Sequence, residues 1–282
     1  MKNLTKLLIA AGFFASAGIY IHDRQLDVHR ITVRHERLPE GFEGARVLHL
    51  SDLHSKTFGE MNGNLISSCE ACKPDIIFFT GDLISKNENR SFFDAKLYLF
   101  ERLTAICDVY FILGNHEQYN PENCKYICDK LKKLGVKILK NESDFVYRNG
   151  DRIKVTGLRP SVKCYRTNNG YADLLPITEE YVESLLGECD RDEFNILLSH
   201  NPFGFEAYAE WGADLVFSGH CHGGIIRLPL LGGLLSPERR FFPKYTKGTY
   251  FYDSSKMIVS AGLGKFRVNN PAEIVVCTLT RG

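Results

Sequence analysis

The amino-acid sequence predicts an α/β protein built on parallel strands, and two observations lead to this fold class. Three times in the first half, a short apolar segment is followed by a polar cluster and then by a helical pattern. Such a succession forms parallel strands, because the helix returns the chain to the end of the sheet at which the previous strand began, and the next strand then runs in the same direction. Nearer the C-terminus, short alternating segments without intervening helices indicate antiparallel strands that close a second sheet.

The first half begins with a lead-in segment, residues 25–44. It has an alternating edge-strand pattern at 29–37 and a turn at Leu38-Pro39-Glu40-Gly41. No linker follows Pro39, so we expect one main domain over residues 45–282. Apolar runs predict strands at 46–50, 75–79 and 109–113, and helical patterns predict helices at 61–72, 91–106 and 121–134.

The second half has a more mixed pattern. Asn149-Gly150-Asp151 between two apolar segments is a strong hairpin signal, because Asn and Gly accept the positive φ angles of a tight turn. Residues 163–176, rich in Asn, Gly and Tyr, predict a surface loop. The other expected elements are strands at 136–139, 145–148, 153–156, 194–198, 213–217, 248–252, 257–260 and 272–279, and helices at 179–186 and 203–211.

The composition is that of an ordinary globular protein. Hydrophobic residues make up 44% of the 282 residues, enough for a substantial core. The 35 basic and 34 acidic residues nearly cancel, so no overall field attracts nucleic acid, and we expect none as a partner. The nine cysteines are an odd number, and Cys69, Cys72, Cys124 and Cys128 fall in expected helices as small buried hydrophobes. We predict no disulfide.

We expect the first 24 residues to be a signal-anchor or a signal peptide. Residues 7–21 carry no charge, and as a helix they would be about 22 Å long, short for a bilayer core of roughly 30 Å. Ala15-Ser16-Ala17 has the form of a cleavage site, whereas Lys6 and Arg24 could reach the two interfaces of a retained anchor, which we favour. Lys2 and Lys6 predict a cytoplasmic N-terminus. The rest of the chain is then expected outside the cytoplasm, anchored to the cell membrane, secreted or bound to the cell wall.

Polar side chains gather where the expected strands end. In parallel sheets, ligands bind at the carboxyl ends of the strands. Five of the nine histidines stand there, whereas His49 alternates onto the other face of its strand and is expected to pack in the core. The residues at the strand ends are Asp52, His54, Asp82, Asn115, His116, His200, His220 and His222.

This set of side chains indicates a metal site. Carboxylates, imidazoles and an amide without a thiolate suit Mn²⁺, Fe or Zn²⁺. The candidates are too many for one ion, and they suit two divalent ions about 3.5–4 Å apart, bridged by a carboxylate and a hydroxide. Asp82 stands alone on its loop and is the expected bridge. Cys221, between His220 and His222, is expected to point away from the site.

In order and spacing, these motifs resemble those of the calcineurin-like metallophosphoesterases. The resemblance covers residues 46–279 and implies a four-layer α/β/β/α sandwich of two mixed sheets flanked by helices. It rests on Asp52-x-His54, Gly81-Asp82, Gly114-Asn115-His116-Glu117, His200 and Gly219-His220-x-His222. It implies that Asp52, His54 and His222 hold one ion, that Asn115, His200 and His220 hold the other, and that Asp82 is shared.

The resemblance also implies the reaction, hydrolysis of a phosphodiester or phosphomonoester. A hydroxide between the ions would attack phosphorus, and His116 would protonate the leaving oxygen or stabilise the transition state. A non-catalytic metal-binding scaffold of the same fold would have lost ligands or His116, and neither is missing. A nuclease would show a basic stripe, which this balanced sequence lacks.

Finer features resemble a membrane- or wall-associated bacterial branch of the family, which includes the YkuE and YaeI phosphoesterases. They are the N-terminal hydrophobic segment, residues 223–229 and Phe242-Pro243-Lys244-Tyr245. Because some relatives cleave UDP-diacylglucosamine, a lipid-linked or sugar-nucleotide lipid substrate is implied. Ile225 departs from the Gln that this branch often has. Arg159 and Arg227 are candidates for binding substrate phosphate, although surface salt bridges would explain them equally well.

Overall fold

The computed structural model describes residues 25–228, 231–264 and 267–282 of the chain. The expected N-terminal anchor or signal peptide, residues 1–24, lies outside these described residues. Within the described ranges, no helix has the length and apolar character needed to cross a membrane.

The repeated strand and helix pattern of the first half forms one side of the first sheet, as predicted. The strands are short and almost entirely buried, because apolar layers cover both faces of a parallel sheet. All neighbours among them are parallel. These elements are β2 (Arg46–Leu50), α2 (Gly63–Cys72), β3 (Ile76–Phe79), α3 (Asp94–Thr104), β4 (Asp108–Ile112), α4 (Asn115–Tyr119), α5 (Pro121–Lys133) and β5 (Lys137–Leu139).

The first sheet is completed by the two ends of the described chain, in the order β1-β14-β2-β3-β4-β5. β1 (Leu26–Arg34) lies at the edge, as its alternation predicts. β14 (Ala272–Thr280) was expected in the second sheet, and this prediction is wrong: it pairs with β1 in parallel and with β2 antiparallel. Its residues are apolar on both faces, with Ile274 facing the helices and Val275 facing the other sheet, so a central position buries both.

The second sheet has the order β12-β13-β9-β8-β7-β6. β13 is antiparallel to β12, as expected, but parallel to β9. The β6–β7 hairpin turns at Asn149 (φ 50°) and Gly150 (φ 89°), which confirms the turn signal. A separate small ribbon pairs β10 (Arg227–Leu228) with β11 (Gly232–Gly233). The strands of the second sheet and the helices between them are β6 (Glu142–Arg148), β7 (Asp151–Leu158), α6 (Glu179–Leu186), β8 (Asn195–Ser199), α7 (Phe205–Trp211), β9 (Leu215–Ser218), β12 (Gly248–Tyr252) and β13 (Ser255–Val259).

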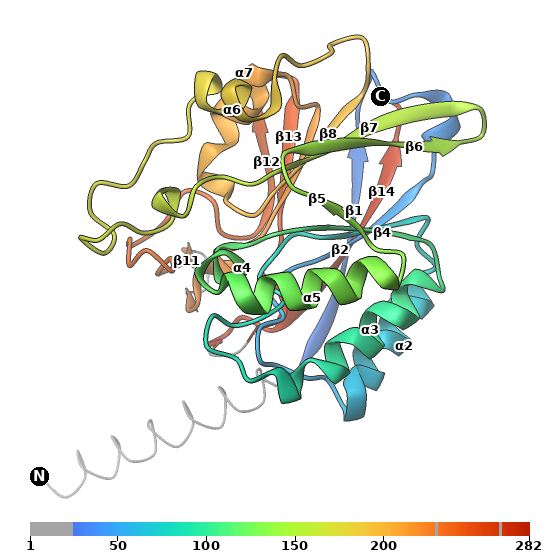
Figure 1. Ribbon diagram of the computed structural model, residues 1–282. Coiled ribbons are helices and arrows are strands. Elements are labelled where there is room, and N and C mark those ends of the chain that lie inside the picture. The colour runs from blue at the N-terminus through green and yellow to red at the C-terminus, as the bar shows by residue number, and fades with distance from the viewer. Residues whose placement is uncertain (1–24, 229–230, 265–266) are drawn as a thin grey trace, which may run out of the picture.

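Three apolar cores separate four layers (Figure 1). The first lies between the first sheet and α2, α3 and α5, the second between the two sheets, and the third between the second sheet and α6 and α7. This is the predicted α/β/β/α sandwich of two mixed sheets. All nine cysteines are described and free, as predicted, and Cys124 and Cys128 are buried.

His49 packs in the core between the sheets, as predicted. Its Nε2 atom lies 2.8 Å from Thr80 Oγ1, and its ring meets Phe217 edge-on at a centroid distance of 5.2 Å. Burial disfavours the charged imidazole and lowers the pKa of His49 to about 4. His49 is therefore neutral in the folded protein at any pH above this value.

We expect His49 to make the protein acid-sensitive. The unfolded chain takes up a proton at His49 near pH 6.5, whereas the folded protein resists protonation down to about 4, so stability falls as the pH drops through this window. Between pH 8 and pH 5 this group removes about 2 kcal/mol from the free energy of unfolding. Urea unfolding at both pH values should show a smaller difference for His49→Gln; an identical difference would contradict the prediction.

Candidate metal centre

The strand-end residues come together at one side of the two sheets. Asp52 and His54 follow β2, Asp82 follows β3, and Asn115 begins the short helix α4 after β4. From the second sheet, His200 follows β8, and two further histidines follow β9 at positions 220 and 222. The parallel strands thus bring residues that are far apart in the sequence to one place, as predicted.

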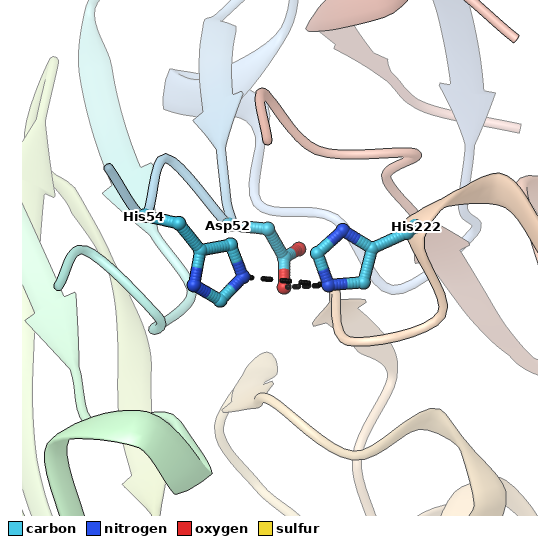
Figure 2. Close-up of side chains that lie close together, drawn as sticks. All are labelled: Asp52, His54 and His222. Carbon is cyan, nitrogen blue, oxygen red and sulfur yellow. Dashed lines mark hydrogen bonds and ion pairs between the residues drawn. The ribbon is translucent and has the colours of Figure 1, made fainter. Parts of the chain in front are cut away.

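Figure 2 shows one half of the cluster, in which two imidazoles approach the carboxylate of Asp52 from opposite sides. The Nε2 atoms of His54 and His222 lie 3.4 Å apart, and His222 Nε2 lies 3.7 Å from Asp52 Oδ1. One ligand atom from each of the three residues lies within 4.8 Å of the others. These three residues could hold one metal ion.

The other half forms around Asp82, His200 and His220, whose ligand atoms also lie within 4.8 Å of one another. His200 Nε2 is 3.2 Å from Asp82 Oδ2, and the same carboxylate oxygen is 3.7 Å from His54 Nε2. Asp82 therefore lies between the two halves.

The backbone at the cluster adopts conformations that L-residues rarely take. A non-glycine residue at positive φ is uncommon, and such residues gather at functional sites. Two glycines are also required: a Cβ at Gly114 would overlap Asp82 Oδ1, and one at Gly219 would overlap Ser51 Oγ. The candidate ligands at positive φ are Asp52 (55°), His54 (51°), Asp82 (53°), His220 (69°) and His222 (49°).

The protonation states of the imidazoles suit metal binding. Burial lowers the pKa of His54 to about 4 and that of His222 to about 3, so both are neutral at neutral pH and can offer a lone pair. Burial also acts to lower the pKa of His200, but the carboxylate of Asp82 outweighs it and raises this pKa to about 10. A cation in the site would take the place of that proton.

Two buried atoms support the fit to metal ions. Asn115 Oδ1 is buried without a hydrogen-bond partner, and His200 Nε2 is buried facing the carboxylates of Asp82 at 3.2 Å and Asp52 at 3.8 Å. Buried polar atoms are almost always bonded, so unpaired ones need an explanation. An ion coordinated by imidazole nitrogen, amide oxygen and carboxylate oxygen satisfies these atoms, and this donor set suits Mn²⁺, Fe or Zn²⁺.

His116 lies beside the cluster, half-buried, with its ring 4.6 Å from that of His54. Its backbone N–H donates to Asp82 Oδ1 at 2.8 Å, and its Nδ1 accepts the N–H of Lys86 at 3.1 Å. An Nδ1 that accepts a hydrogen bond leaves the proton of the neutral ring on Nε2. His116 is also near enough to His54 and Asp82 to form a third group that could hold a metal ion. The tautomer with the proton on Nε2 instead makes His116 a proton donor.

Glu117 holds the loop of Asp82 in place. Its carboxylate is fully buried and accepts the N–H groups of Asp82 (2.9 Å), Ile84 (3.0 Å) and Gly114 (2.8 Å). Such an arrangement joins the ends of β3 and β4 and holds the backbone of Asp82.

Glu238 is a site residue that the sequence did not reveal. Its buried carboxylate accepts a hydrogen bond from His220 Nε2. Burial opposes the charge, but the attraction of His220 lowers the pKa of Glu238 to about 2. A carboxylate that receives one ring N–H of a histidine orients the other nitrogen toward a metal. Glu238 has no regular element or motif around it in the sequence, so no signal pointed to it.

We expect Glu238→Ala to weaken metal binding about 10- to 100-fold, because His220 loses the group that fixes its tautomer and orientation. Glu238→Gln keeps the shape and one hydrogen bond, so its loss should be smaller. Calorimetric titration of Mn²⁺ into the metal-free protein measures both. Glu206→Gln, which removes a carboxylate that pairs with Lys244 on the surface, is the control. Equal affinity of the Ala variant and the wild type would refute the role.

The two arginines predicted as possible substrate contacts form other hydrogen bonds. Arg159 is exposed, and its Nε donates to Gln118 Oε1 at 3.2 Å. Arg227 is half-buried and donates to the carbonyl oxygen of Gly223 at 2.9 Å. Substrate binding by these residues stays a prediction.

Two cavities open on the cluster. One, of about 270 Å³, is lined by Asp82, Asn115, His220 and further polar and aromatic residues. The other, of about 290 Å³, is lined by His54, Ser55, Ser85, Ile225 and others. His116, His222 and Pro237 border both. A substrate can therefore extend from the cluster in two directions.

A buried cluster of imidazoles and carboxylates at the strand ends of a four-layer sandwich defines a metal-dependent hydrolase. The family model described as calcineurin-like phosphoesterase matches residues 45–224, more than half of the chain. The chain therefore belongs to this family, and the prediction of a metal-dependent phosphoester hydrolase is confirmed.

Three relatives agree with this assignment. The metallophosphoesterase YkuE of Bacillus subtilis (strain 168) is 29% identical over 268 residues, which cover 92% of this chain and 88% of YkuE. Metallophosphoesterase Cj0846 of Campylobacter jejuni is 30% identical over 284 residues, 97% of this chain and 68% of Cj0846. The phosphodiesterase YaeI of Escherichia coli (strain K12) is 24% identical over 242 residues, 82% of this chain and 82% of YaeI.

Proposed function

We propose that this chain hydrolyses a lipid-linked phosphoester at the cell envelope with two divalent metal ions, Mn, Fe or Zn. The observation that supports two ions is the position of the Asp82 carboxylate between the His54 and His200 imidazoles. Asp52, His54 and His222 would hold one ion, Asn115, His200 and His220 the other, and Asp82 both.

The residues of the site have different roles in this reaction. Bound at these side chains, the ions would supply positive charge for the phosphate oxygens and an activated water for attack on phosphorus. Glu117 and Glu238 orient the ligands. His116, with its proton on Nε2, donates to the leaving oxygen.

Apolar features around the 290 Å³ cavity support a lipid-linked substrate. Ile225 and Pro237 line this cavity, and Leu231, Phe241 and Phe242 on the segment that follows are 66%, 72% and 55% exposed. Exposed apolar side chains next to a binding site are typical of surfaces that meet a lipid or another apolar partner. The charge-free segment at residues 7–21 would anchor the chain to the membrane nearby, with its catalytic part outside the cytoplasm.

A substrate panel tests the proposal. Purified protein loaded with Mn²⁺ or Zn²⁺ is given nucleotide diesters, p-nitrophenyl phosphate, sugar-nucleotide lipids and phospholipids, and phosphate or alcohol release is followed. We expect the highest kcat/KM on a lipid-linked substrate, and Phe241→Ser/Phe242→Ser should lower that value alone. A preference for a soluble nucleotide diester would refute the lipid part of the proposal, and no turnover with either metal would refute the whole.

Membrane attachment has its own test. The full chain should sediment with membranes, and a variant that lacks residues 1–24 should stay in the supernatant. Equal distribution of the two proteins would contradict an N-terminal anchor.

A further inference from the structure

The 270 Å³ cavity at the metal cluster has a cationic wall. Lys86 and Arg166 line it together with Tyr119 and Tyr171. Lys86 follows β3 on the loop of Asp82, and Arg166 lies on the segment between β7 and α6. Both side chains are exposed. Two segments far apart in the sequence thus bring positive charge to one side of the candidate metal centre.

Aromatic rings, rather than acids, lie next to these cations. Lys86 Nζ lies 5.8 Å from the ring centre of Tyr119, and Arg166 Cζ lies 5.7 Å from that of Tyr171. Arg239, on the segment after β11, also approaches Tyr171, with its Cζ 6.0 Å from the ring centre. Such cation–π contacts hold a cation in place without cancelling its charge.

In the described part of the chain, these cations are not held in ion pairs. Over the described ranges, no carboxylate forms an ion pair with Lys86, Arg166 or Arg239, whereas surface cations such as Arg152 and Lys244 have carboxylate partners. The acids that line the same cavity have other partners: Glu238 bonds to His220, and Asp82 contacts His200.

The second cavity is different. Among the described residues that line it there is no Lys or Arg, and Ile225 and Pro237 make part of it apolar. His116 borders both cavities, so a phosphoester held at the cluster can reach a space lined by cations and a second, partly apolar space.

We infer that Lys86, Arg166 and Arg239 form a subsite for a second anionic group of the substrate, one that is not the ester being hydrolysed. Guanidinium and ammonium groups bind phosphoryl oxygens by charge-assisted hydrogen bonds, so a second phosphoryl group is the expected ligand. The inference rests on the proposed function, because the scissile phosphoester has to sit at the metal centre. The substrate then places its second phosphoryl group in one cavity and its apolar group in the other.

Three matched diesters test the subsite: the p-nitrophenyl phosphates whose second alcohol is ethyl, 2-phosphonoethyl or 2-carboxyethyl. All release p-nitrophenolate, and the phosphonate C–P bond is not hydrolysed. We expect the Mn²⁺-loaded wild type to prefer the phosphonoethyl ester over the ethyl ester by about 10-fold or more in kcat/KM, mainly through KM. The carboxyethyl ester shows whether any anion suffices, and a preference for it over the phosphonoethyl ester would refute a phosphoryl ligand.

Variants that remove one positive charge test which residues cause the preference for the phosphonoethyl ester. Arg166→Gln and Lys86→Gln should each reduce the preference for the phosphonoethyl ester about 10-fold, whereas Lys163→Gln, an exposed cation on the same segment as Arg166 but outside the cavity, should keep it. Equal losses on the ethyl and phosphonoethyl esters, or no loss, would overturn the inference.

A binding measurement separates this inference from the proposed function. Methylenediphosphonate should bind the Mn²⁺-loaded wild type more tightly than methylphosphonate, and Arg166→Gln should remove most of the difference. If no diester is hydrolysed but this difference is found, the proposed function fails and the anion subsite stands. If the diesters are hydrolysed without any preference, the subsite fails and the proposed function stands.

Discussion

Asp82→Asn is expected to abolish hydrolysis and to lower the metal content of the protein. The carboxylate lies close to imidazoles of both halves of the cluster, 3.7 Å from His54 Nε2 and 3.2 Å from His200 Nε2. An amide carries no negative charge and cannot bridge two cations in the same way. Loss of an orienting carboxylate alone costs 10- to 100-fold, so the loss of a shared ligand should exceed about 100-fold.

The Asn variant is a sharp test because it keeps the fold. Its Oδ1 can still accept the His116 N–H, which Asp82 accepts at 2.8 Å, so the α4 turn is preserved. Metal content by mass spectrometry and turnover of the best substrate are measured together. Asp129→Asn, on the exposed face of α5, is the control. Wild-type metal content with wild-type turnover would refute the bridging role of Asp82.

His116→Ala is expected to retain metal and to lose rate. Its Nδ1 accepts the Lys86 N–H, so Nε2 carries the proton that the leaving oxygen needs. A positioned general acid contributes about 10²- to 10⁴-fold. The loss should be largest for an alkyl ester, whose alkoxide must be protonated, and smaller for a p-nitrophenyl ester, whose leaving group departs as a stable anion.

The metal content of His116→Ala distinguishes the role of general acid from the role of metal ligand. His116 also forms a group with His54 and Asp82 that could hold an ion. If His116→Ala loses metal, or slows alkyl and p-nitrophenyl esters equally, it is not the general acid. His29→Ala, which removes a partly exposed imidazole on β1, controls for the loss of a histidine elsewhere.

The strand-end residues of the site were predictable because the α/β fold makes position in sequence informative. A polar residue directly after a buried parallel strand must lie at the carboxyl edge of the sheet, as Asp52, Asp82 and His200 do. The same regularity places His49 in the core, because it is on the opposite face of β2.

Features that depend on contacts between distant segments were not predictable. The apolar run of β14 shows a buried strand, but not that it lies between β1 and β2 rather than in the second sheet. Glu238 belongs to a segment without regular periodicity and is defined only by its contact with His220. The cationic wall joins Lys86, Arg166 and Arg239 from three separate segments, and as isolated residues they are ordinary surface cations.

The sequence by itself determined the fold class, the family and the set of side chains that meet at the sheet edges, because strand, turn and helix patterns are local and metal ligands need particular donor atoms. Only the tertiary structure decided which of these donors face one another, which carboxylate orients His220, and which side of the site is cationic. Those properties are distances between segments, and the packing of the two sheets fixes them.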